Sequence, residues 1–564
     1  MSFEVPKDRP WFKFWPPGIP KTLDYPRVPL FNIVEVSAQR YPDKTAIIYY
    51  GTRITYSELW DSILNFAGYL KELGIKKGDK VAIYMPNSPH WVIAYYGILR
   101  ANAVVVPINP LLVEDELLYI LKDSEAKVVV TLSLFARRVL NVKEESPVEH
   151  VIVGQFKDYL PKEPEIRVHP LMLKEPEIPE GVIKWSEIFK EKRTPPPVEV
   201  SHEDIAMIPY TAGTTGTPKG CIHTHSTVWA TTLGSATWFS ACPSAVHLTV
   251  LPLFHVTGLI HSLNAPLYAG GTIVLFSMWD KEAALDAIEK YKITHWVNIS
   301  TMVVDLLATP GIEKRDLSSL VLVGGGGAPM PEAVAKKLEE LTGLKYVEGY
   351  GLTETISQTH VNPPHRPKLQ CLGIPHFGVD ALIIDPETGK VLPPGQQGEI
   401  VLRGPSVFKG YWKKPEATKE AFIEIDGKSY FRTGDVGYMD EEGYFFIVDR
   451  LKRMINRAGF KVWPTSVELK LYQHPAIQEA CVVGTPDPRV GEEVKAYIVL
   501  KPEYKGKVKP EEIIEWAKQR MAAYEYPRII EFVDSLPKSG AGKILWRVLQ
   551  EEERKKAAAK TGEK

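Results

Sequence analysis

Residues 210–220 combine glycines, hydroxyls and a cation in one short segment, Tyr-Thr-Ala-Gly-Thr-Thr-Gly-Thr-Pro-Lys-Gly. Backbone N–H groups and threonine hydroxyls can donate hydrogen bonds to phosphate oxygens, and Lys219 adds a positive charge. The segment is not a Walker A loop, because Pro218 precedes the lysine and Gly220 follows it, where that motif has glycine and then serine or threonine. The pattern predicts a different phosphate-binding loop, with any magnesium ligand supplied from elsewhere in the chain.

A second segment, Tyr350 to Glu354, places an aromatic ring, a hydroxyl and a carboxylate within five positions. An aromatic face can stack on a nucleotide base, and a carboxylate can bind Mg²⁺. Asp435 and Arg450 are further candidates for contacts with a nucleotide. Each of these signals is weak alone, since the ordinary interpretations of the last two are a turn aspartate and a surface arginine.

The glycine run 324–327 suggests a dinucleotide-binding turn only at first sight. That fingerprint needs G-x-G-x-x-G opening a helix, with an acidic residue about 20 positions later. Pro329 stands where the helix would run, which disfavours a nicotinamide or flavin oxidoreductase. A glycine turn after a buried strand still allows a flat ligand to approach the backbone closely.

Alternating helical and strand patterns in the first 350 residues indicate how these groups are positioned. The alternation predicts an α/β body of two subdomains with largely parallel sheets. From residue 380 to about 449 the pattern changes to strands with tight turns, which predicts a β-rich subdomain. Residues 453–564 have helices and strands of their own and predict a small α+β domain. Seven prolines between Pro6 and Pro29 indicate an extended arm lying on the body.

The composition excludes several classes of protein. The 68 basic and 69 acidic residues give a net charge of −1, so a strongly basic nucleic-acid-binding domain is disfavoured. No apolar run approaches the roughly 18 residues needed to span a bilayer. The four cysteines include no CxxC pair of zinc-site spacing and are expected to be reduced thiols. These features predict a cytoplasmic protein with no nucleic-acid partner and no integral membrane segment.

Five motifs occur in order along the chain: residues 210–220, 350–354, 430–435, 449–461 and 537–544. In this order and spacing, the chain resembles the acyl-adenylate-forming (AMP-binding) superfamily, which includes acyl-CoA synthetases, luciferases and peptide-synthetase adenylation domains. The resemblance covers about residues 30–550. It implies that a carboxylate and ATP form acyl-AMP and pyrophosphate, after which the thiol of coenzyme A displaces AMP. It also implies a large body over 1–449, a hinge at 450–452 and a mobile C-terminal domain over 453–564.

The resemblance also assigns roles to individual residues. Contacts with the nucleotide fall to Thr211, Gly213, Thr214, Thr215, Gly216, Thr217, Lys219, Gly326, Ala328, Pro329, Tyr350, Gly351, Thr353, Asp435 and Arg450. Lys543, Glu354 and His255 are the expected catalytic residues: Lys543 reaches the carboxylate and α-phosphate, Glu354 binds Mg²⁺ together with Thr214, and His255 gates the acyl site. Lys452 is the expected hinge, and Gly459 and Phe460 are expected to contact coenzyme A after the domain rotates. Two positions depart from the family pattern, since Ala212 stands where most members carry serine and Trp546 where a basic residue is frequent.

The acid to be activated is less defined. Residues 253–256 lack the aspartate with which amino-acid-activating domains hold an amine, and no carrier domain follows Lys543, which favours coenzyme A as acceptor. Acetate-specific relatives carry tryptophan at the position of Gly351, so glycine predicts a more open pocket. The candidate acyl-pocket residues are Val256, Gly258, Trp296, Asn298, Ser300, Val323 and Gly351.

Several alternatives stay open at this point. The polar side chains of Asn298 and Ser300 favour a short-to-medium-chain acid, such as the hydroxylated 4-hydroxybutyrate, unless they bond to the protein itself. A medium- or long-chain fatty acid, or a carrier-loading or luciferase-like reaction, is the alternative. His255 could also be a core histidine with its hydrogen bonds satisfied. A non-catalytic nucleotide-binding protein is disfavoured because Lys543, Glu354 and Asp435 are all present. A monomer and a homodimer are both compatible with the sequence.

Overall fold

The computed structural model describes residues 4–211, 217–327, 330–538 and 544–562. Its first sheet has seven strands in the order β7-β6-β5-β3-β4-β8-β9, parallel except for the last pair. The strands are β3 (Lys80–Tyr84), β4 (Val104–Ile108), β5 (Ala126–Leu132), β6 (His150–Gly154), β7 (Ile183–Lys184), β8 (Ile205–Met207) and β9 (His223–Thr224). Parallel strands that are covered on both faces form continuous apolar runs, as Val128–Val130 does here.

The second sheet has nine strands in the order β16-β15-β14-β13-β12-β10-β11-β1-β2. They are β1 (Thr45–Tyr49), β2 (Thr52–Thr55), β10 (Val246–Thr249), β11 (Thr272–Leu275), β12 (His295–Asn298), β13 (Leu322–Gly326), β14 (Val347–Leu352), β15 (Ser357–Val361) and β16 (Ile374–Pro375). The central strands are parallel, and the early strand β1 pairs with β11. The two α/β subdomains are therefore interleaved rather than simply consecutive.

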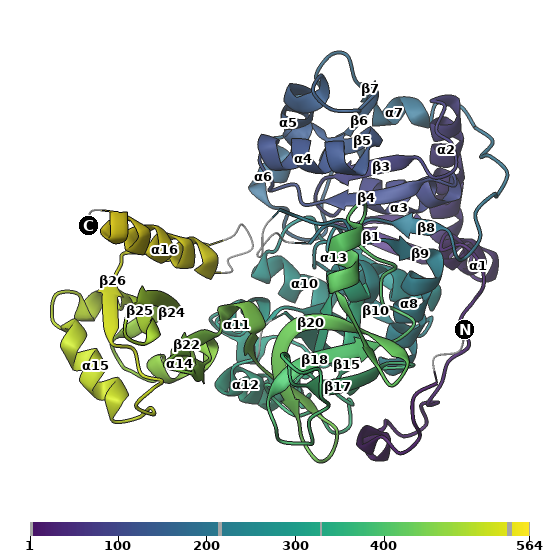
Figure 1. The fold of residues 1–564 in the computed structure, drawn as a ribbon. Helices are drawn as coiled ribbons and strands as arrows, with labels where there is room; N and C mark the ends of the chain where they lie inside the picture. Colours follow the sequence, from purple (N-terminus) through teal and green to yellow (C-terminus); the bar gives the residue numbers. More distant parts are fainter. Residues whose placement is uncertain (1–3, 212–216, 328–329, 539–543, 563–564) are drawn as a thin grey trace.

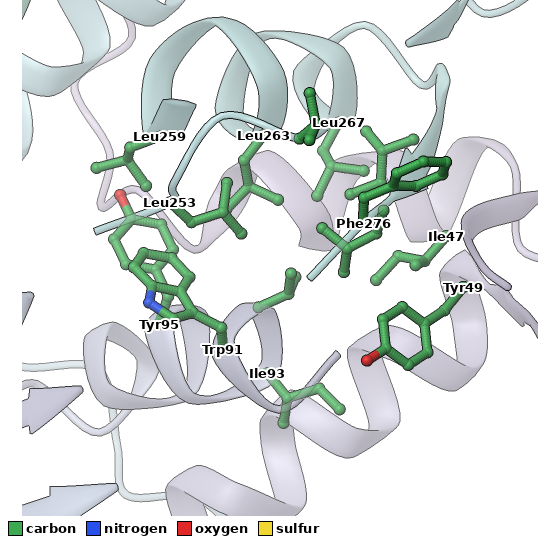
Figure 2. Packing of buried hydrophobic residues seen from close by; sticks show 14 of the residues in the cluster. Ile47, Tyr49, Trp91, Ile93, Tyr95, Leu253, Leu259, Leu263, Leu267 and Phe276 are labelled. Carbon is green, nitrogen blue, oxygen red and sulfur yellow. The ribbon is translucent and has the colours of Figure 1, made fainter. Parts of the chain in front are cut away.

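Helices cover both sheets and join them into one body (Figure 1). The longer ones are α1 (Asn32–Arg40), α2 (Tyr56–Glu72), α3 (Pro89–Arg100), α4 (Glu114–Ser124), α5 (Ser133–Lys143), α8 (His225–Trp238), α10 (Lys281–Tyr291), α11 (Ser300–Leu307) and α12 (Glu332–Thr342). Shorter ones are α6 (Pro170–Leu173), α7 (Trp185–Ile188), α9 (Ala265–Tyr268) and the π-helix η3 (Gly258–Asn264). Figure 2 shows Trp91 and Tyr95 of α3 packed against Leu259 and Leu263 of η3, so one apolar core spans both subdomains.

The β-rich subdomain contains an antiparallel sheet in the order β17-β18-β20-β19, with β21 beside β20. Its elements are β17 (Asp380–Ile384), β18 (Gly398–Arg403), α13 (Pro415–Glu420), β19 (Phe422–Ile425), β20 (Lys428–Met439) and β21 (Phe445–Arg450). A short 3₁₀ turn, η6 (Leu451–Arg453), follows β21 and leads to the C-terminal domain.

The C-terminal domain has its own sheet and its own apolar core (Figure 1). It comprises β22 (Ile455–Arg457), β23 (Phe460–Val462), α14 (Pro464–Leu471), β24 (Ile477–Asp487), β25 (Gly491–Leu500), α15 (Pro510–Lys518), β26 (Ile529–Phe532) and α16 (Trp546–Gly562). The predicted fold class is confirmed: a large α/β body with a β-rich subdomain and a small α+β C-terminal domain. No helix in the described part of the chain is both long and apolar enough to cross a membrane.

The N-terminal arm lies on the body, as its prolines predict. Arg9 donates two hydrogen bonds to the buried carboxylate of Asp380, at 2.9 and 3.1 Å. The ring of Trp15 packs edge-on against Trp238 of α8, with ring centres 4.9 Å apart. The arm therefore links the β-rich subdomain to a helix of the second α/β subdomain.

Five buried histidines are held neutral by the fold: His223, His225, His261, His360 and His376. Burial lowers the pKa of the first three to about 4 and that of the last two to about 3. In the unfolded chain each would titrate near its ordinary value of about 6.5. The stability that the neutral, buried histidines contribute is therefore complete above about pH 6.5. It is lost as the pH falls from about 6.5 towards the folded-state pKa values of about 4 and 3.

We expect the protein to become acid-labile well before most of its carboxylates are protonated. The urea midpoint should fall steeply between about pH 7 and pH 5, because the unfolded chain binds protons that the folded chain excludes. Replacing His376 by Phe should remove part of this pH dependence. A midpoint that is constant over the same range in the unmodified protein would contradict this reasoning.

Candidate active site

The phosphate-binding segment begins and ends as a narrow hairpin between β8 and β9. Tyr210 and Gly220 form an antiparallel bridge, and the N–H of Thr211 donates to the carbonyl of Lys219 at 2.9 Å. The N–H of Lys219 donates in turn to the hydroxyl of Thr211 at 3.1 Å. Thr217 lies exposed near the end of the segment. Four expected contact residues lie outside the described residues, namely Gly213, Thr214, Thr215 and Gly216.

Tyr411 brings the cation of this segment close to the expected magnesium ligand. The ammonium group of Lys219 lies 4.8 Å from the centre of the Tyr411 ring. The hydroxyl of the same tyrosine donates to Oε1 of Glu354 at 2.8 Å. Sequence reasoning missed Tyr411, because a tyrosine in a loop far from both motifs carries no local signal. The pairing of a cation with a carboxylate at one spot is suited to binding a metal–phosphate complex.

The expected ribose-binding group is a fully buried carboxylate. Asp435 and Arg450 face each other across β20 and β21, and Nε of Arg450 lies 2.6 Å from Oδ1 of Asp435. The hydroxyl of Tyr350 donates to Oδ2. Burial, followed by the charge of Asp435, raises the pKa of Tyr350 well above its usual value. A carboxylate only accepts hydrogen bonds, at both of its oxygens, which suits it to the hydroxyls of a sugar.

The residues expected to contact the base follow the carboxyl ends of β13 and β14, the end of the strands at which ligands bind in open α/β sheets. The ends of these strands carry glycine because their neighbours are close. A Cβ at Gly326 would come within 2.5 Å of the carbonyl of Gly349. Thr353 is fixed from the other side, since Nε2 of His223 donates to its carbonyl at 2.7 Å. Ala328 and Pro329, which are expected to contact the base, lie outside the described residues.

Glu348 is a further buried group, in β14, that sequence reasoning did not single out. Its Oε1 accepts hydrogen bonds from the N–H groups of Met330, at 3.3 Å, and Gln370, at 3.0 Å. Burial raises the pKa of Glu348 to about 7 despite these bonds. The carboxylate therefore fastens the backbone that follows the glycine turn to a second loop.

The candidate acyl-pocket residues Val256, Trp296, Ser300 and Val323 are buried, and Gly258 opens the π-helix η3. The buried amide of Asn298 has protein partners on both sides. Its Nδ2 donates to the carbonyl of Trp296 at 3.1 Å, and its Oδ1 accepts from the hydroxyl of Tyr346 at 2.9 Å. This arrangement favours the interpretation in which its polarity serves the protein and not a hydroxylated substrate.

His255 is exposed, so the alternative of a core histidine is wrong. It stands just before η3, and its Nδ1 accepts a hydrogen bond from the N–H of Thr257 at 3.3 Å. An exposed ring at the entrance of a buried apolar region is compatible with a gate.

Gly351 has a structural reason to be glycine besides an open pocket. A Cβ at this position would come within 1.8 Å of the carbonyl oxygen of Ser357 and 2.8 Å of Cα of Gln358. Both obstacles are backbone atoms of β15, and the register of β14 on β15 shifts at this point. A tryptophan here would therefore have to displace β15 before it could fill the pocket.

We expect Gly351→Ala to destabilise the body by about 1–3 kcal/mol through overpacking, with loss of activity on all acids alike. The matched control is Gly349→Ala in the same strand, where the nearest atom would lie 3.3 Å away. Urea unfolding and activity on short and long acids measure the two effects. An alanine variant of normal stability with a shifted chain-length preference would instead support a pocket role alone.

The described residues with expected roles in the hinge and in coenzyme A binding, Lys452, Gly459 and Phe460, are all exposed. Lys452 lies exposed in η6. Gly459 has a positive φ of 85° at the turn between β22 and β23 and faces open space, while Phe460 stacks on Tyr524 with ring centres 4.9 Å apart. Lys543 lies outside the described residues, but the residues flanking its segment, Lys538 and Ile544, form an antiparallel bridge.

The chain matches two family descriptions. Residues 34–412 match the AMP-binding enzyme family, and residues 466–543 match the AMP-binding enzyme C-terminal domain. A long-chain-fatty-acid–CoA ligase of Bacillus subtilis (strain 168) is 40% identical over 558 residues, which is 97% of this chain and 98% of that protein. A protein of the same name from Escherichia coli O6:H1 is 34% identical over 564 residues, with the same shares of both chains.

Solved structures agree with this result. The structure of ATP-bound MatB from Rhodopseudomonas palustris is 28% identical to this chain, with a TM-score of 0.81 over 93% of this chain and 99% of that one. A Mycobacterium tuberculosis fatty acyl CoA synthetase is also 28% identical, with a TM-score of 0.73 over 93% and 98%. Together with the matching families, these relatives show that the chain belongs to the AMP-binding enzyme family and is an ATP- and coenzyme A-dependent acyl-CoA synthetase, an acid–thiol ligase.

Proposed function

We propose that the substrate is a long-chain fatty acid and that the product is the corresponding acyl-CoA. The observation that supports this most is the 40% identity to a long-chain-fatty-acid–CoA ligase over nearly the full length of both chains. The internal hydrogen bonds of Asn298 support it as well, since they remove the main argument for a short hydroxylated acid. The proposed substrate is therefore the long-chain alternative that the sequence left open, and not a short-to-medium-chain acid.

In the first half-reaction a carboxylate oxygen attacks the α-phosphorus of ATP, and the bond from that phosphorus to the bridging oxygen breaks. The electron pair of that bond leaves with pyrophosphate. Lys543 neutralises the approaching anions, Lys219 holds the phosphate tail, and Asp435 accepts hydrogen bonds from the ribose. Glu354 fits a magnesium ion, because it offers a single carboxylate beside a cationic phosphate loop, and Mg²⁺ commonly binds one or two carboxylates plus substrate phosphates. When bound, the ion would supply further positive charge to the phosphates.

In the second half-reaction the thiol of coenzyme A attacks the acyl carbon, and AMP leaves with the electron pair of the acyl–oxygen bond. We propose that the C-terminal domain turns about Lys452 between the two steps. The turn would withdraw Lys543 and bring Gly459 and Phe460 towards the site. The exposed position of Phe460 and the open space at Gly459 are suited to a surface that is used only after rotation.

The decisive experiment measures pyrophosphate release and thioester formation across straight-chain acids from C2 to C18, with 4-hydroxybutyrate and ferulate alongside. We expect kcat/KM to rise with chain length by up to about fourfold per added methylene, because each buried CH₂ contributes about 0.8 kcal/mol. A maximum at C4, or a preference for the hydroxylated acid over butyrate, would contradict the proposal.

Ferulate tests a second candidate, an aromatic acid. Feruloyl-CoA synthases from Amycolatopsis and Streptomyces are 34% identical over 514 residues, or 90% of this chain. In this chain Trp296 of the candidate pocket stacks nearly parallel on Trp279, at an angle of 9° and with ring centres 5.8 Å apart. Such a pair presents a flat apolar wall, and this observation favours an aromatic acid as the second candidate. A higher kcat/KM for ferulate than for the straight-chain acids would support it.

A further inference from the structure

A buried carboxylate of the body binds the C-terminal domain across the expected hinge. Asp449 lies in β21, where it is paired with Val436 of β20, so the backbone that precedes Lys452 belongs to the body. Its Oδ2 accepts a hydrogen bond at 2.7 Å from the N–H of Thr465, in the first turn of α14. The side chain of Asp449 is only 1% exposed, which shields this bond from water. The bond therefore joins two parts of the chain that the proposed rotation would separate.

The first turn of α14 has no side-chain cap from its own segment. Trp463 precedes the helix and offers no side-chain acceptor to it, and Pro464 has no N–H. The first N–H groups of a helix need acceptors from outside the helix, and the helix dipole favours a carboxylate at this end. Asp449 supplies such an acceptor from the body. Moving α14 away from β21 would leave the N–H of Thr465 without it.

Arg453 connects the same carboxylate to the interior of the C-terminal domain. Its guanidinium donates to Glu468 of α14 at 2.5 Å and to the carbonyl of Val482 at 3.2 Å. The ring of Trp546, at the start of α16, lies 5.5 Å from the guanidinium. These three partners lie in the C-terminal domain, so Arg453 belongs to that domain. Its Nη1 lies 3.8 Å from Oδ1 of Asp449, so the body holds the domain at a point from which both α14 and α16 are placed.

A cavity beside these contacts shows that the junction is not tightly packed. The cavity has a volume of about 240 Å³ and is lined by Val436 of the β-rich subdomain and by Met454 and Trp463 of the C-terminal domain. Protein interiors contain few voids larger than a water molecule, so apolar packing contributes little here. The ion pair between Glu387 and Lys461 also crosses the junction, at 3.3 Å, but exposed pairs of this kind contribute little. The buried bond of the hinge region is thus the stronger of the two polar links.

We propose that Asp449 is a positioning residue that holds the C-terminal domain in the orientation of the first half-reaction. The proposal rests on the proposed rotation about Lys452. In the observed orientation the start of α16, which follows Lys543 in the sequence, is directed towards the body (Figure 1). Phe460, which is proposed to act after the rotation, is exposed. Breaking the bond to Thr465 should therefore favour the second half-reaction over the first.

The test places spin labels on both parts of the full-length protein, at Lys336→Cys in α12 and Lys518→Cys in α15, which are exposed positions. The background is Cys242→Ser, because the other three cysteines are buried. Double electron–electron resonance without substrates then measures the distribution of distances between the labels. Asp449→Ala should lower the ratio of the observed to the rotated orientation by about 10- to 100-fold, the loss expected for a hydrogen bond to a charged group. Asp449→Asn keeps an acceptor oxygen and should lower the ratio less.

The two half-reactions provide the second measurement. In Asp449→Ala, pyrophosphate release should fall, while thioester formation from supplied acyl-AMP should be unchanged or faster. The affinity for ATP should stay the same, because the variant leaves Asp435 in place. Equal loss of ATP binding would overturn the proposal, since it would mean that the substitution acts through the nucleotide site. Equal loss of both half-reactions would overturn it too, as the result of a purely structural role.

Glu387→Gln is the matched control, because it removes the exposed carboxylate of the same junction and should leave the distances nearly unchanged. An unchanged distribution in Asp449→Ala would overturn the proposal. The distances are measured without any acid, so failure of the unmodified protein to activate fatty acids would contradict the proposed substrate and would leave this result as it is.

Discussion

A Lys543→Ala variant should lose acyl-adenylate formation by at least about 10²- to 10³-fold, the range seen when one preorganised group is removed from a developing charge. The same variant should still convert supplied acyl-adenylate and coenzyme A to acyl-CoA at close to the normal rate. The reason is that two anions meet only in the first step, when the carboxylate approaches the phosphate. Pyrophosphate release and thioester formation from synthetic acyl-AMP measure the two steps separately.

Lys538→Ala is the matched control, since Lys538 flanks the same segment but is paired with Glu479 of the C-terminal domain. It should leave both steps nearly intact. Equal loss of both half-reactions in Lys543→Ala would mean that the lysine serves both domain orientations, and the proposed alternation of domains would have to be abandoned.

Asp435→Asn should raise the dissociation constant of ATP by about 10²- to 10⁴-fold. Hydrogen bonds to an ionised group contribute about 1.5–3 kcal/mol each, and a ribose offers two hydroxyls. The substitution keeps the shape of the side chain but removes the charge that holds Arg450 at 2.6 Å. Equilibrium binding of ATP and AMP should show similar losses, since both nucleotides contain the ribose.

Asp380 provides an unusually close control, because it is also a buried carboxylate bound by an arginine and a tyrosine. Arg9 donates to it at 2.9 and 3.1 Å, and the hydroxyl of Tyr430 donates at 2.8 Å. Asp380→Asn should therefore destabilise the protein about as much as Asp435→Asn while leaving nucleotide binding unchanged. If both variants lost ATP affinity equally, the effect at Asp435 would be one of stability and not of contact.

Much of the fold could be predicted because its signals are local. Continuous apolar runs such as Val128–Val130 mark parallel strands buried on both faces, and the change to tight turns near residue 380 marks the antiparallel subdomain. The pairing of β1 with β11 could not be predicted, because strand order depends on which apolar faces meet in three dimensions. The same limit explains why the two subdomains are interleaved.

The residues of the candidate site also divide into those with a local sequence signal and those that act through contacts with distant segments. Motif residues such as Asp435 and Arg450 were identified as a set, and the structure brings those two together across neighbouring strands. Tyr411 and Glu348 act through contacts with distant segments, and single residues of these types give no signal in a sequence. The polarity of Asn298 pointed to a substrate hydroxyl until its partner Tyr346, 48 positions away, became visible.

The N-terminal arm has a mechanical consequence. The proposed rotation of the C-terminal domain needs a rigid base, and the arm ties the β-rich subdomain, whose strand β21 leads to the proposed hinge, to helix α8 of the main body. In the proposed rotation, the arm therefore belongs to the fixed part of the molecule and the C-terminal domain is the moving part. Loosening a few residues near the start of the chain would then make the base of the proposed hinge less rigid, although that hinge lies more than 400 positions further along the sequence.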